Sequence, residues 1–406
     1  MTSGRPLRGT GRLASGVLAA TVLLGSLAHA GLPLHEFLIL HSYGWPAEQV
    51  TGRLDARSAQ RIAGAHYNTV MCTEAELELV AKAGLRCLLI GRSQGAPDWK
   101  GESVSTAVAS RLASNPAVWG YYLMDEPDNS NARRGALFPQ LAEKVTAFGA
   151  ADPNHVAWIN VSSATGRFLD DYMSVVRPGL LSFDLYRWWA RESDWWRGLE
   201  AHRDAALRAG VPMIVWIESN TSEKRFNAHL PPPRDNATKL RWSVYTSLAY
   251  GSKGVQWFLG SVDDDISALN AELSAMGPTL VNLRSTHVFH TSGVPREGLQ
   301  LPDSSWYSSN ARDLLIGEFA SRGEPDATYL LIANKSIDGD ADPMLEFRGR
   351  NVVAVEEVSR TSTGRTPLPT EQQAGVTRVR LHLGAGDGRL IRVQARQAAD
   401  PAHEQP

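Results

Sequence analysis

The sequence predicts an α/β protein: a (β/α)8 TIM barrel followed by a small C-terminal antiparallel β-sandwich. Three observations lead to the barrel. Short apolar segments alternate with helical segments from about residue 37 to residue 284. The apolar segments lack the polar alternation of half-exposed strands, as expected for parallel strands covered on both faces by helices. Their combined span of roughly 250 residues is also the usual size of an eightfold barrel.

Eight segments have strand character and are bounded by Gly, Pro, Ser or Asp: 37–40, 67–72, 86–90, 118–124, 155–160, 181–185, 212–217 and 254–259. Segments with helical periodicity lie between them, among them 58–64, 74–84, 104–114, 133–149, 194–210 and 236–250. An open doubly wound sheet is the alternative, but it normally has a Gly-rich phosphate turn after its first strand. Here His-Ser-Tyr-Gly-Trp-Pro follows at 41–46, so the closed barrel is preferred.

The pattern changes after about residue 283. Strand-like segments with period two occur without long helices between them, at 314–319, 328–333, 352–358, 376–383 and 389–393. The Gly-rich segment 384–388 is a turn signal between the last two. The predicted domains are therefore a barrel over residues 31–284 and a β-sandwich over residues 285–397, followed by a polar, disordered tail over residues 398–406.

Residues 1–30 have the three-part pattern of a secretory signal peptide. Arg5, Arg8 and Arg12 precede an uncharged apolar stretch over residues 14–27, and Ala28-His29-Ala30 follows. We expect cleavage after Ala30 and a secreted or periplasmic protein, with an uncleaved anchor as the alternative. No later segment could cross a bilayer, so no integral membrane segment is expected after cleavage.

The composition and net charge limit the classes of partner and cofactor that can be expected. A net charge of −2 in 406 residues gives no electrostatic reason to expect nucleic acid or an anionic membrane surface, and a neutral carbohydrate fits better. No cofactor or metal is expected: the histidines are scattered, and the acidic run 263–265 lacks the spacing and glycine of a calcium loop. The oligomeric state is left open.

The chain has two cysteines, Cys72 and Cys87. Cys72 is expected where the second strand ends and Cys87 where the third begins. In a parallel pair these are opposite ends of the barrel, too far apart for a disulfide. We therefore expect two buried free thiols.

Two glutamates stand where a predicted strand gives way to a polar loop. Glu126 follows the fourth strand and Glu218 the seventh. Functional side chains of such barrels come from the C-terminal strand ends, so these two carboxyl groups are expected to face each other across the mouth. Retaining glycoside hydrolysis needs two carboxyl groups roughly 5–5.5 Å apart, one as acid and one as nucleophile. A helix cap or a structural ion pair is the alternative for either glutamate alone.

The segments 119–127 (WGYYLMDEP), 181–189 (LSFDLYRWW), 211–219 (VPMIVWIES) and 254–260 (GVQWFLG) together resemble the superfamily of retaining (β/α)8 glycoside hydrolases that have the acid/base after strand 4 and the nucleophile after strand 7. The resemblance covers roughly residues 35 to 285. It implies that Glu126 is the acid/base and Glu218 the nucleophile. It also implies that Tyr186 hydrogen-bonds the nucleophile and that Trp257 is the platform under the sugar.

One residue departs from that pattern. The superfamily usually has Asn immediately before the acid/base, where it holds the substrate 2-hydroxyl, and this chain has Asp125. An ionised Asp125 could accept a hydrogen bond from a hydroxyl but could not donate one. A second carboxylate beside Glu126 also raises the cost of ionising either group, which suits a general acid.

Further strand-end residues are candidates for binding sugar hydroxyls, each with a loop-anchoring hydrogen bond as the alternative: His41, Arg92, Asn160 and Asp184. Trp188 is a candidate for stacking on a sugar, whereas Trp195 and Trp196 are expected to begin a helix and pack on the barrel. The expected function is a retaining glycoside hydrolase acting on an oligo- or polysaccharide, with β-linkages favoured. The alternatives are a non-catalytic glycan-binding barrel and a transglycosylase that uses the same two glutamates.

Overall fold

The computed structural model describes residues 34–42, 54–93, 96–97, 104–127, 136–163, 165–188, 191–219 and 236–396, with the backbone alone at residues 92–93, 96–97, 236 and 396. The predicted barrel is confirmed: eight strands close in the order β1-β10-β9-β8-β7-β6-β3-β2, and every neighbouring pair is parallel. The barrel strands are β1 (Leu38–His41), β2 (Thr69–Cys72), β3 (Arg86–Leu89), β6 (Val118–Asp125), β7 (Val156–Val161), β8 (Leu181–Asp184), β9 (Met213–Glu218) and β10 (Gly254–Phe258).

Helices follow the strands in turn: α1 (Ala56–Gly64), the short 3-10 helix η1 (Glu74–Glu76), α2 (Leu77–Lys82), α3 (Thr106–Leu112), α4 (Phe138–Ala151), α5 (Arg167–Val175), α6 (Glu192–Ala209), α8 (Asn236–Ala249) and α9 (Asp264–Leu280). Local signals set their ends. The side chains of Asp55, Ser105 and Asp263 each accept a hydrogen bond from the first turn of the helix that follows. Gly210 ends α6 in the left-handed conformation that glycine adopts without strain. A short antiparallel pair, β4 (Arg92–Ser93) with β5 (Ala96–Pro97), follows β3.

The barrel strands are apolar on both faces because they bury both. One set of side chains fills the interior, among them Leu40, Met71, Trp158, Ile214 and Trp216. The alternate set packs under the helices, as Ile39 and Val215 do. This two-sided burial is the physical reason for the continuous apolar segments in the sequence.

The C-terminal part is antiparallel, as predicted, except that the short edge strand β12 pairs with β11 in parallel. A seven-stranded sheet has the order β12-β11-β14-β15-β21-β17-β18, and a four-stranded sheet the order β13-β16-β20-β19. Their strands are β11 (Leu283–His290), β12 (Leu299–Gln300), β13 (Tyr307–Ser309), β14 (Leu314–Ser321), β15 (Glu324–Asn334), β16 (Met344–Phe347), β17 (Asn351–Val358), β18 (Arg365–Pro367), β19 (Glu371–Gln373), β20 (Val376–Arg380) and β21 (Gly388–Arg396). Side chains from both sheets form one buried cluster, which includes Ile316, Ile332, Leu345, Phe347 and Val379. The two sheets are therefore the layers of a sandwich.

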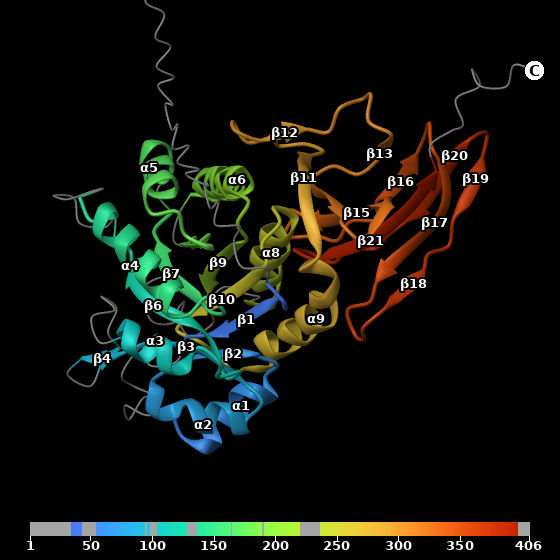
Figure 1. Ribbon diagram of the computed structural model, residues 1–406. Coiled ribbons are helices and arrows are strands. Elements are labelled where there is room, and N and C mark those ends of the chain that lie inside the picture. The colour runs from blue at the N-terminus through green and yellow to red at the C-terminus, as the bar shows by residue number, and fades with distance from the viewer. Residues whose placement is uncertain are drawn as a thin grey trace, which may run out of the picture.

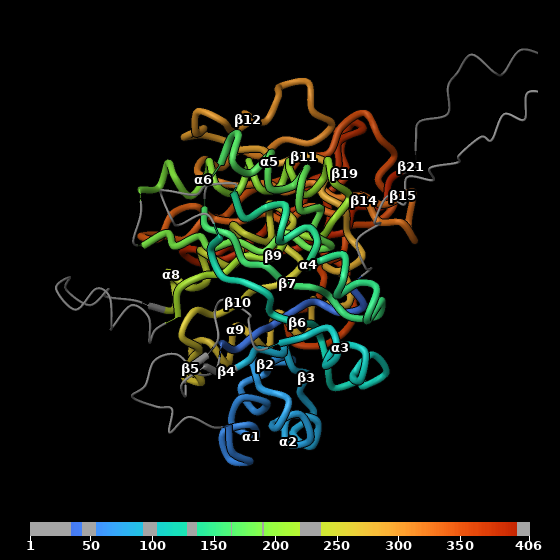
Figure 2. Tube along the Cα trace, turned by 60° about the vertical axis from the view of Figure 1, so that its left-hand side comes forward, coloured from blue at the N-terminus to red at the C-terminus, as the bar shows by residue number. Residues whose placement is uncertain are grey.

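Helix α8 joins the barrel to the sandwich. It contacts β9 of the barrel on one side and β14, β15 and β21 of the large sheet on the other. In Figure 1 it lies with α9 between the barrel and the orange and red strands. Figure 2, turned by 60°, keeps α1 and α2 at one end of the molecule and β12 at the other. Glycine allows the close approach: a Cβ at Gly317 would lie 2.2 Å from the Ala249 carbonyl oxygen, and one at Gly388 2.4 Å from the Tyr245 ring.

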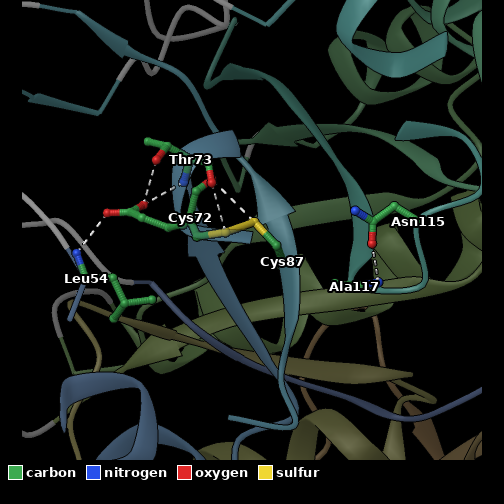
Figure 3. The surroundings of a disulfide bond; sticks show 7 residues. Leu54, Cys72, Thr73, Cys87, Asn115 and Ala117 are labelled. Carbon is green, nitrogen blue, oxygen red and sulfur yellow. Dashed lines mark hydrogen bonds between the residues drawn. A yellow bond between two sulfur atoms is a disulfide. The ribbon is translucent and has the colours of Figure 1, made fainter. Parts of the chain in front are cut away.

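The expectation of two free thiols is wrong, because Cys72 and Cys87 form a disulfide (Figure 3). Each of the two strands has only four residues, and their register pairs Val70 with Cys87 and Cys72 with Leu89. The two cysteines are thus only two register positions apart, and both side chains belong to the layer under the helices. Their Cα atoms are 5.6 Å apart, within the range that a disulfide bridges.

Loss of this disulfide is expected to lower stability measurably. The two cysteines are 15 residues apart in sequence, and cross-linking a loop of that length stabilises a fold by about 3 kcal/mol through the unfolded state. We expect the Cys72→Ser/Cys87→Ser variant to unfold at a lower urea concentration than the wild type without reductant, and adding reductant to abolish the difference. Equal midpoints in both conditions would contradict this expectation.

The signal peptide and its cleavage site after Ala30, and the tail over residues 398–406, lie outside the described residues. Among the helices that are described, none has the length and apolar character needed to cross a membrane.

Candidate active site

The end of β6 is irregular and positions two carboxyl groups. Its register with β7 shifts between Tyr122 and Met124, so β6 has one extra residue there before Asp125 pairs with Asn160. Such bulges re-aim the side chains that follow. Glu126 then has a φ of 37°, an uncommon conformation for a residue with a side chain, and its N–H donates to the Asn160 carbonyl at 2.8 Å. Both Asp125 and Glu126 are half-buried at the barrel mouth.

Glu218 is the last residue of β9 and is paired with Phe258 of β10. Its side chain is buried, 3% exposed. The backbone N–H of Trp188 donates to its Oε1 at 2.7 Å. A backbone donor of this kind favours the ionised carboxylate and fixes its orientation. The loop after β8 thus holds the carboxyl group that ends β9.

Asn160 connects the carboxyl groups at the ends of β6 and β8. Its Nδ2 donates to Asp184 Oδ1 at 2.8 Å and to Asp125 Oδ1 at 3.2 Å. Its Oδ1 accepts from Ser182 Oγ at 2.8 Å, and Ser182 Oγ in turn accepts from Trp216 Nε1 at 3.0 Å. The indole and hydroxyl donors fix which way the amide points, since its oxygen faces Ser182 and both N–H groups face the carboxyl groups.

Two tyrosines border this cluster. Tyr122 donates its hydroxyl to Asp125 Oδ1 at 2.6 Å. Burial, together with the negative charges of Asp184, Asp125, Glu126 and Glu218, raises the pKa of Tyr186 well above its usual value. Tyr186 therefore stays protonated and is a hydrogen-bond donor in the midst of these four carboxyl groups. Its predicted hydrogen bond to Glu218 stays a prediction.

Asp184 is the last residue of β8, and its Oδ1 accepts the hydrogen bond from the Asn160 amide. Burial, then the charges of Asp125 and Glu126, raise the pKa of Asp184 well above its usual value, against the opposing effect of the Asn160 amide. Glu126, Glu218, Asp125, Asp184, Asn160 and Tyr186, all predicted as site residues, thus come together at one end of the barrel.

Trp257 does not lie in this cluster, and the expectation that it is the sugar platform is wrong. Its side chain is completely buried, and its Nε1 donates to Asn270 of α9 at 2.8 Å. Successive residues of a strand point to opposite faces, so Trp257 packs under the helices and its neighbour Phe258 points to the interior. The Phe258 ring is half-buried and lies 5.3 Å from the Tyr186 ring, between centroids.

The structure gives less support to the other predicted site residues, His41, Trp188 and Arg92. His41 is buried against Tyr67, with ring centroids 4.9 Å apart, and burial lowers the pKa of His41 to about 3, so its ring is neutral. The Trp188 ring packs against Trp242, 5.7 Å between centroids, so the residue reaches Glu218 through its backbone. The Arg92 side chain lies outside the described residues.

Trp195 and Trp196 are buried in α6 and both pack on Trp242, as expected for a pair that supports the barrel. In the part of the chain that the structure describes, no three His, Cys, Asp or Glu side chains group as metal ligands.

Four residues of the site were not predicted from the sequence: Tyr122, Ser182, Trp216 and Phe258. Their only sequence signal is an apolar or small side chain at an inward strand position, which is shared by most of the barrel core. Phe258 stands one residue beyond Trp257 in the segment that carries the resemblance, but alternation says only that the two point to opposite faces and not which of them faces the interior.

No protein-family model matches this chain, and comparison with curated proteins gives no match. Among solved structures, it is similar to a GH27 β-L-arabinopyranosidase from Geobacillus stearothermophilus, with a TM-score of 0.51 and 9% identity over 93% of this chain and 99% of that one. It is also matched to a family 39 glycoside hydrolase from the gut symbiont Bacteroides cellulosilyticus WH2, with a TM-score of 0.45 and 13% identity over 88% of this chain and 80% of that one. At 9% identity, the first likeness shows that the two chains share a fold.

Proposed function

We propose that this protein is a retaining glycoside hydrolase with Glu218 as nucleophile and Glu126 as acid/base. The observation that supports it most is the meeting of two glutamates at the C-terminal ends of β6 and β9, the fourth and seventh barrel strands, with the Tyr186 hydroxyl among them. Barrel enzymes place their chemistry at this end. The shared fold with a glycoside hydrolase agrees with the proposal.

In the first step, a Glu218 oxygen bonds to the anomeric carbon as the bond from that carbon to the leaving oxygen breaks, and the proton of the Glu126 carboxyl group passes to the leaving oxygen. The Trp188 N–H directs the Glu218 carboxylate. In the second step, Glu126 takes a proton from water, the water oxygen bonds to the anomeric carbon, and the ester to Glu218 breaks. The first step leaves Glu126 ionised, as the second step needs, and the second step leaves Glu126 protonated and Glu218 ionised again.

The substrate side of the proposal is an oligo- or polysaccharide with β-linkages. Phe258 and Tyr186 give the mouth an apolar surface beside the carboxyl groups, and flat rings of this kind pack on the apolar faces of sugars. Asp125, with Tyr122 and Asn160 already bound to its Oδ1, is an acceptor for a sugar hydroxyl.

We also propose that the protein is exported. The pattern of residues 1–30 supports this, and so does the Cys72–Cys87 disulfide, since structural disulfides are typical of oxidising compartments. N-terminal sequencing of the protein from culture medium and periplasm is expected to begin at Gly31, and an intact Met1 in the cytoplasm would contradict export.

A 2-deoxy-2-fluoro glycoside tests the mechanism, because it slows the second step and lets the covalent intermediate accumulate. The protein is screened on aryl β-glycosides and β-linked oligosaccharides, labelled with the fluoro sugar of the best substrate, and digested for mass spectrometry. We expect the label on the peptide containing Glu218 and a product whose first-formed anomer is the same as that of the substrate.

A label on another residue, or an inverted product, would contradict the retaining assignment. Glycan binding without turnover or label would favour the non-catalytic alternative, which the unusual Asp125 also suggests. Transfer to added sugar acceptors in preference to water would identify a transglycosylase.

A further inference from the structure

We propose that Arg187 is a positioning residue that aims the backbone N–H of Trp188 at the carboxylate of Glu218. The inference rests on the proposed function and deepens it, because it names what keeps the nucleophile in place. In this role Arg187 does not act on the sugar. It acts through the peptide group that joins it to Trp188.

The N–H that Glu218 accepts belongs to the peptide group between Arg187 and Trp188. A peptide group is planar, so the Cα atoms on its two sides set its direction. The chain turns at these two residues, and both of their side chains lie against the Trp242 ring on α8. The centroid of that ring is 5.7 Å from the Trp188 centroid and 5.4 Å from Arg187 Cζ. Contacts to one buried residue therefore hold the peptide group from both of its ends.

The Arg187 side chain is itself fixed by several contacts. Its Cζ lies 4.7 Å from the centroid of the Trp188 ring, within the range of a cation–π interaction. Its Nη2 donates to Glu192 Oε2 at 2.9 Å, and the other oxygen of Glu192 accepts from Trp196 Nε1 at 3.1 Å. Trp196 packs on Trp242 in turn, with 5.2 Å between ring centroids. This closed circuit of contacts ties the loop after β8 to the start of α6 and to α8.

Arginine suits this position for a physical reason. The Arg187 side chain is only 18% exposed, so water screens its pair with Glu192 less than it screens a surface ion pair. A planar guanidinium can bind a carboxylate along its edge and still lie over an aromatic ring. Arg187 does both. Lysine offers a cation for the same partners but no planar group.

The position of the Trp188 N–H matters for the first step of the reaction. Glu218 Oε1 accepts this N–H at 2.7 Å, so a movement of the donor turns the carboxylate away from its direction of attack. Reacting atoms must lie about 3–3.5 Å apart and be aligned, and a misplacement of about 1 Å can cost on the order of 10²-fold in rate. Arg187 is thus expected to affect kcat although it transfers no proton and forms no bond to the sugar.

Arg187→Met tests this role on the best aryl glycoside. The substitution keeps an unbranched side chain beside Trp242 and removes the charge that pairs with Glu192. We expect kcat and the rate of labelling by the fluoro sugar to fall by about 10–100-fold, with KM changed less than about threefold. Arg187→Lys keeps a cation and is expected to recover part of the lost kcat. Arg197→Met is the matched control, because Arg197 lies on α6, 51% exposed, and pairs only with the neighbouring Asp194 among the described residues.

The hydrogen bond itself can be followed by NMR without any substrate. With 15N in tryptophan alone, the Trp188 backbone amide is identified by the loss of its signal in Trp188→Phe. Its proton is expected to lie downfield in the wild type, because its acceptor is a carboxylate, and to move upfield in Arg187→Met but not in Arg197→Met. Glu192→Gln breaks the same ion pair from its exposed partner, 55% exposed, and is expected to move the signal in the same direction. This second variant decides the question if Arg187→Met does not fold.

A Trp188 amide signal that stays in place in the folded variants of Arg187 and Glu192 overturns the positioning role, whatever the activity of the protein. Wild-type kcat in Arg187→Met, or a loss that lies in KM alone, also overturns it, while the proposed function stands if Glu218 still takes the label. Absence of turnover and label in the wild-type protein counts against the proposed function instead. The two failures are therefore distinguishable.

Discussion

Replacing Glu218 with Gln is expected to reduce kcat/KM by on the order of 10⁴–10⁶-fold, as removal of a catalytic nucleophile or its partners does in other enzymes. The glutamine side chain is nearly isosteric with glutamate, and its amide oxygen could still accept the Trp188 N–H, which Glu218 accepts at 2.7 Å. It could not form the glycosyl ester, because a neutral amide is a poor nucleophile. Steady-state kinetics and the melting temperature of the same preparation provide the measurement.

The melting temperature of this variant is expected to equal or exceed that of the wild type, since the substitution removes a buried charge from a cluster of carboxyl groups. Glu78→Gln is the matched control, because Glu78 lies on α2 with its side chain 82% exposed, and its activity is expected to be that of the wild type. Retention of more than a tenth of the wild-type kcat/KM by the Glu218 variant would show that this carboxyl group is not the nucleophile.

Replacing Asp387 with Ala is expected to destabilise the protein by about 3–5 kcal/mol, the usual cost of breaking a buried ion pair by removing one partner. Asp387 Oδ1 accepts from Arg241 at 2.6 Å and from Arg360 at 2.9 Å. Arg241 also binds both oxygens of Glu272, at 2.9 Å each. These residues come from α8, α9 and the two segments that flank β17 and β21, so the network joins the barrel to the sandwich. Without Asp387, two partly buried guanidinium groups would share the single carboxylate of Glu272.

The effect of this substitution depends on pH. Burial opposes the ionisation of Asp387, but Arg241 and Arg360 outweigh it and hold the pKa of Asp387 below its usual value. A lowered pKa in the folded state stabilises the fold above the unfolded value of about 3.9, and this contribution is lost as the pH falls further. Urea unfolding at pH 7 is therefore expected to show the full difference between variant and wild type, and unfolding below about pH 4 a smaller one.

The matched control for this network is Asp342→Ala in the same part of the chain. The Asp342 side chain is 67% exposed and pairs with the exposed His382, 2.9 Å from its Nδ1. It is expected to change stability by less than about 1 kcal/mol. Equal effects of the two substitutions would show that the network contributes nothing beyond ordinary surface ion pairs.

The strands and helices of the barrel could be predicted from the sequence because each follows a local rule. Strands buried on both faces must be apolar throughout, and helices packed on one face must repeat with a period of 3.6. The positions of Glu126 and Glu218 follow from counting such strands, since parallel strands bring their C-terminal ends to one side. The same reasoning placed Asn160 and Asp184 at the mouth, and the resemblance to glycoside hydrolases placed Tyr186 there; the structure finds all three at this end of the barrel.

The sequence could not decide which of two neighbouring strand residues faces the interior of the barrel. Trp257 and Phe258 are adjacent and both aromatic, and only the register of β10 against β9 decides that Phe258 faces the interior. The disulfide was missed for a related reason: the distance between Cys72 and Cys87 depends on where two four-residue strands begin and on their stagger.

The interactions among the carboxyl groups of the site likewise arise only when the chain folds. Asp125, Glu126, Asp184 and Glu218 are spread over about a quarter of the sequence, and nothing local predicts that one amide would bind two of them. Strand ends and helix periods depend on neighbours a few residues away, so the amino-acid order alone decides them. Register and side-chain direction depend on atoms that meet only when the barrel closes, so only the tertiary structure decides them.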